Sequence, residues 1–264
     1  MKCAFIIPPD QVLTRGLFLR RRQQRQIVAE PVFPRRIGSG QVEVVPIRCP
    51  LPEEKPWARQ FLGKGLQLAR HQGAVLSSLE KDGHFFSDPL PENICDGSRY
   101  TLALLPLELE RDCQSWRKLP LAVPVGFSGS NRLALSLAYE ARRLFLYGGA
   151  EEERRHLAAQ IYTQTGLICP TGKLCPKEAE LVLLPPFAPS QCVFTQAKVT
   201  RVKIHPVHDE EGTISAAQAE ALILSAGGLD PWQRWRQLSW LEQIRELGRK
   251  AKRYNLLPIE KTNS

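Results

Sequence analysis

The 264-residue sequence lacks the features of membrane and exported proteins. No apolar run approaches the ~20 residues that a membrane-spanning helix needs. The amino terminus, MKCAFIIPPD, has only a short apolar stretch before two prolines, and no small-residue cleavage site follows it. It therefore does not resemble a signal peptide, and we interpret it as a buried first strand. We expect no transmembrane segment and a cytoplasmic location.

Cysteine pairs at metal-binding spacing are also absent. The seven cysteines are scattered, and none forms a C-x-x-C motif. In a cytoplasmic protein such cysteines are typically reduced thiols. The H-x-x-H pair of His205 and His208 lies beside a proline and three acids, and we interpret it as a polar surface loop. The sequence therefore predicts no bound metal.

Positive charge is present in excess, and it is unevenly distributed. The net charge is +9, of which residues 1–50 carry +6 and the other 214 residues only +3. A concentrated basic region attracts polyanions. We therefore predict a site for nucleic acid or an acidic partner at four arginines of this region: Arg20, Arg21, Arg22 and Arg25.

Strands and helices alternate in the middle of the chain. The apolar strand LPLAVPVGF (119–127) precedes a helical segment, and the strand RRLFLYGG (142–149) precedes a second one. Two short strands follow. Apolar strands with short connections to helices are typical of a parallel sheet covered by helices. This order of elements, over residues 119–186, resembles the nucleotide-binding half of Rossmann-type NAD(P)-dependent dehydrogenases.

The turn GFSGSNR (126–132) joins the first of these strands to its helix. At such a position the free N–H groups and the dipole of the helix favour an anion. The dinucleotide fingerprint G-x-G-x-x-G is incomplete, and a plain strand-to-helix turn is the alternative. The expected cofactor is NAD(P) or another nucleotide. The predicted binding residues are Gly126, Ser128, Gly129, Ser130, Asn131 and Arg132.

The second turn, YGGAEEERRH (147–156), lacks the acid that an NAD-binding protein places at the end of its second strand. Gly148 and Gly149 stand there instead. Three glutamates then occupy the first turn of the helix, where they stabilise the helix and repel phosphate. We interpret Arg154 and Arg155 as solvated surface charges, with contact to a 2′-phosphate as the alternative.

Two further motifs are incomplete. A nucleophile elbow, G-x-S-x-G, would need a glycine at Ser130. A Walker A motif has four residues between its glycines and a serine or threonine after its lysine, but here five residues separate Gly166 from Gly172, and Leu174 follows Lys173. We predict no catalytic residues, and whether the protein is an enzyme stays open.

The last helix is predicted from Pro231 to Tyr254. Its tryptophans and leucines form an apolar stripe, and basic residues lie on the other side. Such a stripe usually packs on the protein's own core; the alternatives are a surface for RNA, a membrane or a partner's groove. The residues predicted to join the amino-terminal arginines in binding nucleic acid or an acidic partner are Arg249, Lys250 and Arg253.

The predicted fold is α/β, with three parts. A basic α+β region spans residues 1–118 and includes a helix from Pro56 and a strand over 100–110. A Rossmann-like parallel-sheet domain spans 119–210, and a helical segment over 211–264 packs on it. The first helix of this segment begins at Ser215, whose spacing to Gln218 is that of a capping box. The predicted function is nucleotide or cofactor binding by a degenerate Rossmann-like domain. The alternative is a non-enzymatic protein that binds nucleic acid or an acidic partner.

Overall fold

The computed structural model describes residues 1–7, 27–49, 56–79, 93–186, 188, 197–203, 205–209 and 212–258. The chain forms two compact units. Unit 1 combines Met1–Asp82, Leu90–Tyr100 and His205–Ser264, and unit 2 combines Gly83–Pro89 and Thr101–Ile204. The carboxyl-terminal helices thus share a unit with the amino terminus, whereas the sequence led us to expect them on the domain over 119–210.

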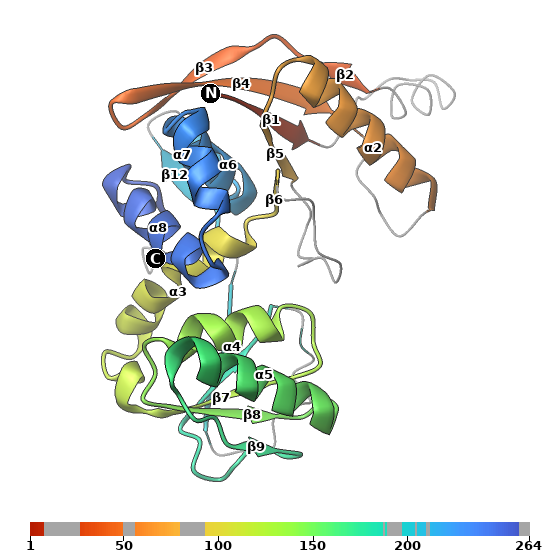
Figure 1. Ribbon diagram of the computed structural model, residues 1–264. Helices are drawn as coiled ribbons and strands as arrows, with labels where there is room; N and C mark the ends of the chain where they lie inside the picture. Colours follow the sequence, from red (N-terminus) through yellow and green to blue (C-terminus); the bar gives the residue numbers. More distant parts are fainter. Residues whose placement is uncertain are drawn as a thin grey trace, which may run out of the picture. The chain divides into compact units, whose positions relative to one another are not determined.

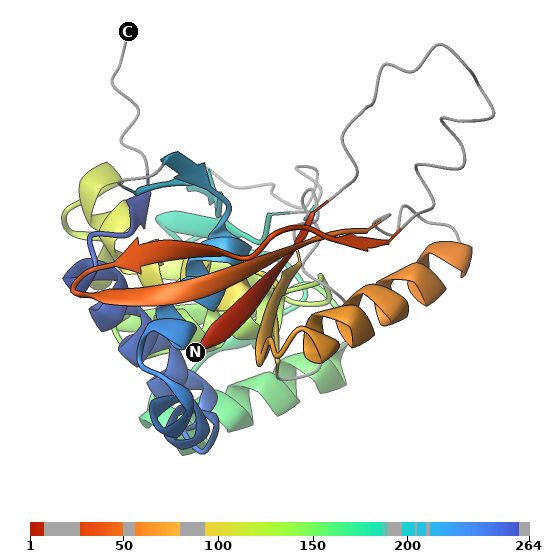
Figure 2. The ribbon, with the colours of Figure 1, turned by 90° about the horizontal axis from the view of Figure 1, so that it is seen from above.

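A mixed sheet forms the centre of unit 1 (Figures 1 and 2). Four strands run parallel in the order β4-β1-β5-β6, and β2 and β3 pair with β4 in the antiparallel direction. The apolar amino terminus forms the central strand β1 and is buried, as predicted. The strands are β1 (Lys2–Ile7), β2 (Val28–Ala29), β3 (Phe33–Ile37), β4 (Gly40–Arg48), β5 (Leu76–Leu79) and β6 (Ile94–Cys95).

Helices α2 (Pro56–His71) and α6 (Ala216–Ala226) pack against this sheet. The prediction of a helix from Pro56 is confirmed, but the helix ends at His71, and the apolar segment after it is strand β5. The capping box predicted for α6 is also confirmed. The Ser215 hydroxyl accepts the Gln218 N–H at 3.2 Å, and the Gln218 side-chain oxygen accepts the Ser215 N–H at 3.0 Å.

The single helix expected over residues 231–254 is wrong. The structure has two helices, α7 (Leu229–Arg236) and α8 (Trp240–Arg253). They are separated because Ser239 caps α8: its N–H donates to the Glu242 carboxylate at 2.8 Å, and its hydroxyl accepts the Glu242 N–H at 3.4 Å. The S-x-x-E spacing of a capping box was visible in the sequence.

The strand expected over residues 100–110 is also wrong, since this segment belongs to helix α3 (Ser98–Asp112). Leu102, Leu105 and Leu109 recur at helical spacing and are buried. Pro106 lies inside the helix, where it removes one backbone hydrogen bond without ending the helix. The sequence analysis gave that proline too much weight.

Unit 2 contains a five-stranded parallel sheet in the order β11-β10-β7-β8-β9. Numbered along the chain from β7, this order read from β9 is 3-2-1-4-5, the order of the Rossmann fold. Helices α4 (Ser130–Ala138) and α5 (Glu151–Thr165) cover one face (Figure 1). The strands are β7 (Pro120–Pro124), β8 (Arg143–Tyr147), β9 (Thr171–Gly172), β10 (Leu181–Leu184) and β11 (Lys198–Arg201). The predicted α/β class with a Rossmann-like parallel sheet is confirmed.

Three short elements complete the fold of unit 1. Strands β12 (Val207–Asp209), β13 (Gly212–Ile214) and β14 (Leu257–Pro258) form a small antiparallel sheet. Unit 2 also has a 3₁₀ turn over Trp116–Lys118. Across the described residues, no helix has both the length and the apolar character needed to cross a bilayer.

Candidate functional site

The turn between β7 and α4 lies where the chain connections of the unit 2 sheet change direction. From the central strand β7, the chain proceeds to β8 and β9 on one side, and β10 and β11 lie on the other. In open parallel sheets, ligands bind in the crevice at the carboxyl ends of the strands at such a switch point. The residues predicted from GFSGSNR therefore occupy this position in the sheet.

Helix α4 begins without a side-chain cap. Its N-cap residue is Gly129, with φ 82°, which has no side chain to accept a hydrogen bond, and the Ser130 N–H donates to the Phe127 carbonyl oxygen at 3.0 Å. In contrast, serine hydroxyls cap α6 and α8. The first N–H groups of a helix have no acceptor within the helix, so an uncapped start is suited to bind an anion.

Ser130, the first residue of α4, is fully buried at 0% exposure. Its hydroxyl has no hydrogen-bond partner among the described residues. A buried hydroxyl without a partner is destabilising by roughly 1–3 kcal/mol. The site therefore contains a polar group for which no described residue supplies a hydrogen bond.

The turns after β7 and β8 touch each other through glycine. A Cβ on Gly126 would lie 3.1 Å from the Gly149 Cα, and a Cβ on Gly149 would lie 2.9 Å from the Val125 carbonyl oxygen. Both glycines also have positive φ, 91° and 52°. A side chain at either position would push the two turns apart, so their close approach accounts for both glycines.

A carboxylate that the sequence analysis assigned only to helix stabilisation lies beside these two glycines. The Glu153 Oε2 atom accepts the Ala150 N–H at 3.3 Å, which stabilises the start of α5. The same atom lies 3.1 Å from the position of a Cβ on Gly149 and 3.7 Å from that of a Cβ on Gly126. Glu153 is exposed. This end of the site therefore repels phosphate and favours a hydrogen-bond donor.

Arg154 is not a solvated surface charge, contrary to the sequence interpretation. It is buried, at 7% exposure, and its Nη1 atom donates to the carbonyl oxygens of Gly148 and, at 2.8 Å, Gly149. The guanidinium thus holds the second glycine turn from inside. Arg155 does lie on the surface, where it pairs with Glu151 at 2.5 Å.

A second arginine holds the segment after β10, on the other side of β7. Arg201 of β11 donates from Nη1 to the carbonyl oxygens of Pro186 at 2.8 Å and Ala188 at 2.5 Å. Beside it, the Phe127 side chain of the β7 turn packs on an apolar cluster that includes Ala122 and Val182. The strand ends on both sides of the β7 turn are therefore fixed by contacts within unit 2.

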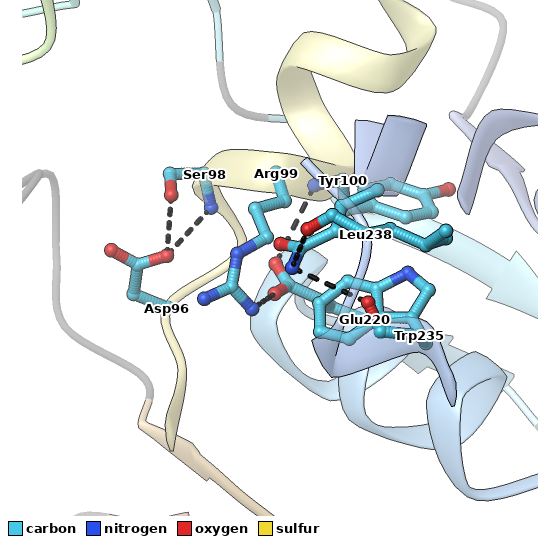
Figure 3. A network of polar contacts seen from close by, with 8 residues as sticks. Asp96, Ser98, Arg99, Tyr100, Glu220, Trp235 and Leu238 are labelled. Carbon is cyan, nitrogen blue, oxygen red and sulfur yellow. Dashed lines mark hydrogen bonds and ion pairs between the residues drawn. The ribbon is translucent and has the colours of Figure 1, made fainter. Parts of the chain in front are cut away.

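Unit 1 contains a separate polar network at the start of α3 (Figure 3). Asp96 accepts the N–H of Ser98 at 2.9 Å and its hydroxyl at 2.6 Å. Glu220 of α6 is fully buried; it pairs with Arg99 at 3.2 Å and accepts the Tyr100 N–H at 3.4 Å. These charges neutralise one another, so we interpret the network as structural. The sequence analysis missed it, although Asp-Gly-Ser before an apolar run is a capping signal.

The described cysteines that show shifted pKa values are poor nucleophiles. Burial raises the pKa of Cys3 to about 12 and those of Cys49 and Cys169 to about 11. It also raises the pKa of Cys95 well above its ordinary value, and Glu220 raises it further. At neutral pH these thiols stay protonated and unreactive.

The other predicted positions lie elsewhere. Arg20, Arg21, Arg22 and Arg25 are outside the described residues. Arg249 and Lys250 of α8 both pair with Glu246, and Arg253 is exposed near the end of that helix. His205 is described, but the side chain of His208 is not. No cluster of potential metal ligands occurs among the residues that the structure describes.

Comparison with known proteins gives no family for this chain. No protein-family model and no curated protein matches the sequence. Among solved structures, L-tryptophan dehydrogenase from Nostoc punctiforme matches with 12% identity and a TM-score of 0.32, over 97% of this chain and 84% of that one. The Leu-bound hetero-hexameric glutamate dehydrogenase from Thermus thermophilus matches with 15% identity and a TM-score of 0.32, over 96% and 73%.

Proposed function

We propose that unit 2 binds a nucleotide at the turn between β7 and α4. The observation that carries this proposal is the uncapped start of α4 at the switch point of a Rossmann-ordered sheet. N–H groups of its first turn would bind phosphate, and the buried Ser130 hydroxyl would add a hydrogen bond. The proposed ligand-binding residues are Gly126, Ser128, Gly129, Ser130, Asn131 and Arg132.

The position of Glu153 favours the binding of one class of nucleotide over another. Its carboxylate lies beside Gly126 and Gly149, and a ribose hydroxyl would donate a hydrogen bond to it. In dinucleotide-binding Rossmann folds an acid after the second strand binds the ribose in this way. A 2′-phosphate at the same place would meet a like charge. The arrangement therefore favours a nucleotide with an unsubstituted ribose, such as NAD, over NADP.

The proposal concerns binding and assigns no catalytic role. The thiols with raised pKa values are unsuited to nucleophilic catalysis, and the buried Glu220 of unit 1 pairs with Arg99. A cytoplasmic location stays a prediction of the sequence, as does the binding role of the arginines at residues 20–25.

The melting temperature of the purified full chain tests the proposal, measured with NAD, NADP, ATP, S-adenosylmethionine and no ligand. A ligand at 100 times its dissociation constant stabilises the folded state by about 2.7 kcal/mol, which is a shift of several degrees. We expect NAD to give the largest shift. Gly129→Asp should abolish it, because the new carboxylate would accept the helix N–H groups and repel phosphate.

Gly166→Asp is the matched control. Gly166 also has positive φ, 73°, but it ends α5 and nothing lies within 4 Å of its Cβ position. This variant should keep the shift with NAD. The proposal is wrong if no nucleotide raises the melting temperature, or if Gly129→Asp responds as the unchanged protein does.

A further inference from the structure

Four basic residues form a stripe along one side of α8 in unit 1. Arg245, Arg249, Lys252 and Arg253 are all exposed. They occupy positions i, i+4, i+7 and i+8, which an α-helix places within about 100° of its circumference. Arg245, Arg249 and Arg253 therefore lie about 6 Å apart along the helix. We call these four residues the basic stripe.

The apolar side of α8 is already used by the protein's own core. Leu241, Ile244, Leu247 and Ala251 are buried, and α8 packs against α6. The contacts in Figure 3 hold the corner before α8: the Arg99 guanidinium lies 5.1 Å from the Trp235 ring centre. The Gln243 side chain also donates to the Leu238 carbonyl oxygen at 3.1 Å. The basic stripe is thus presented by a fixed helix.

The helix dipole explains only part of this charge. Cations in the last turn of a helix are favoured by the dipole, and this accounts for Lys252 and Arg253. It does not account for Arg245, which lies two turns earlier. Two acids of α8 lie beside the stripe: Glu242 caps the helix through Ser239, and Glu246 pairs with Arg249 and Lys250. A bound phosphate would therefore compete with Glu246 for Arg249.

The β3–β4 turn adds one more cation close to the end of the stripe. A Cβ on Gly38 would lie 2.8 Å from the Tyr254 Cδ1 atom, so this turn packs on the residue that follows Arg253. Arg36, two residues before Gly38, is exposed. An exposed cation of β3 therefore lies two residues along the chain from the contact with the end of α8.

We propose that the basic stripe binds the phosphate backbone of double-stranded DNA without sequence preference. A membrane surface fits less well, because an interfacial helix inserts an apolar side and that of α8 is buried. An acidic protein fits less well, because interface cores are apolar, and the described exposed large apolar residues of unit 1 are Val28, Val32 and Leu229, none on α8. Recognition of single-stranded RNA typically adds aromatic stacking, and α8 presents no exposed aromatic side chain.

Fluorescence anisotropy with a labelled 20-base-pair DNA duplex tests the proposal on the full chain. With about four phosphates neutralised, the logarithm of the binding constant should fall with the logarithm of salt at a slope near −3.6. Binding should therefore weaken about 100-fold between 50 and 200 mM salt. Removing the basic stripe, by Arg245→Gln, Arg249→Gln, Lys252→Gln and Arg253→Gln together, should abolish most of this slope.

A matched variant in unit 2 controls for net charge. Arg142, Arg143, Lys173 and Lys177 are exposed, and changing all four to Gln removes the same charge. This control should bind DNA as the unchanged protein does. An equal loss of DNA affinity in both variants would mean that net charge alone causes the binding, and it would overturn the proposal. If the first variant does not fold, Arg245→Gln with Arg249→Gln should still reduce the slope by about 2.

Two further probes separate DNA from other polyanions. Single-stranded RNA of the same length and vesicles with anionic lipid should bind more weakly than duplex DNA at equal salt. Tighter binding to either would overturn the assignment to DNA. Gly129→Asp should leave DNA binding unchanged, so the failure of the nucleotide proposal and the failure of this one are distinguishable.

Discussion

Each unit contains a turn from a parallel strand into a helix. The two turns differ in whether side chains of the protein cap the start of the helix. In unit 1, Asp96 caps the start of α3, and Gly97 packs so closely that a Cβ would lie 2.7 Å from the Ala217 backbone nitrogen. In unit 2, Gly129 starts α4 with no side-chain cap, and the Ser130 hydroxyl has no partner among the described residues.

This difference separates a structural turn from a candidate binding site. The start of α3 is completed by its own side chains and by Glu220, so a ligand would gain little there. At the start of α4 the Phe127 carbonyl accepts the Ser130 N–H, but the buried Ser130 hydroxyl has no partner among the described residues. The two turns have a similar local topology, but only the turn before α4 is a candidate ligand-binding site. The side chains around each turn account for this difference.

Arg99→Ala gives the largest expected effect, because it removes the ion-pair partner of fully buried Glu220. Breaking a buried pair in this way lowers the free energy of unfolding by about 3–5 kcal/mol. Arg155→Ala is the control; its exposed pair with Glu151 contributes about 0.5 kcal/mol or less. Urea unfolding of both variants measures the difference. Equal losses would mean that the unit 1 network does not hold α3 in place.

Gly97→Ala should lower the free energy of unfolding by about 2–4 kcal/mol, through the clash with Ala217 and the strain of positive φ. Gly73→Ala isolates the strain: its φ is also 80°, and nothing lies within 4 Å of its Cβ position. That variant should lose only about 1 kcal/mol. Thermal unfolding compares the two, and a similar loss in both would argue against the close packing of α3 on α6.

A pair of serine variants tests the two turns directly. Ser98→Ala removes a hydroxyl that bonds to Asp96 and should lower the free energy of unfolding by about 1 kcal/mol. Ser130→Ala removes a buried hydroxyl without a partner and should leave stability unchanged or raise it, while it weakens nucleotide binding. Chemical unfolding with and without NAD distinguishes them. Equal destabilisation by both would contradict the contrast between the turns.

The smallest expected effect is a pH dependence in unit 2. Burial raises the pKa of Glu108 from 4.5 to about 7, with Asp112 raising it further and Arg111 and Lys203 opposing. A carboxyl with a raised folded pKa stabilises the fold below pH 4.5, and this contribution is lost as the pH rises through 7.

Glu108→Gln should flatten this dependence. For the half-exposed Glu108 carboxyl the effect is on the order of 1 kcal/mol. Melting temperatures of the protein and the variant at pH 5 and pH 8 measure it. A wild-type protein that becomes more stable between these values would contradict the assigned cause.

Helices and strands that are determined by local sequence signals were predicted correctly. The apolar run of β1, the capping box at Ser215 and the alternation from residue 119 onward are local signals, and the structure confirms them. Where a local signal competed with packing, the prediction failed. Pro106 suggested a strand, yet buried leucines at helical spacing formed α3.

The candidate site was predictable in position but not in chemistry. The glycines of GFSGSNR indicated the turn, and the strand order later placed it at the switch point. The position of the Glu153 carboxylate beside Gly126 depends on how two turns from different strands pack. The burial of Arg154 under the second turn depends on the same packing. Residue spacing in the sequence therefore predicts neither the position of Glu153 nor the burial of Arg154.

Amide hydrogen exchange of the full chain, measured with and without NAD, tests the central claim most directly. Bound phosphate would accept hydrogen bonds from the first N–H groups of α4 and slow their exchange. The account predicts increased protection at residues 126–132 in the presence of NAD and unchanged exchange at residues 95–99, the self-capped turn. Unchanged exchange at residues 126–132, or protection confined to other segments, would contradict it.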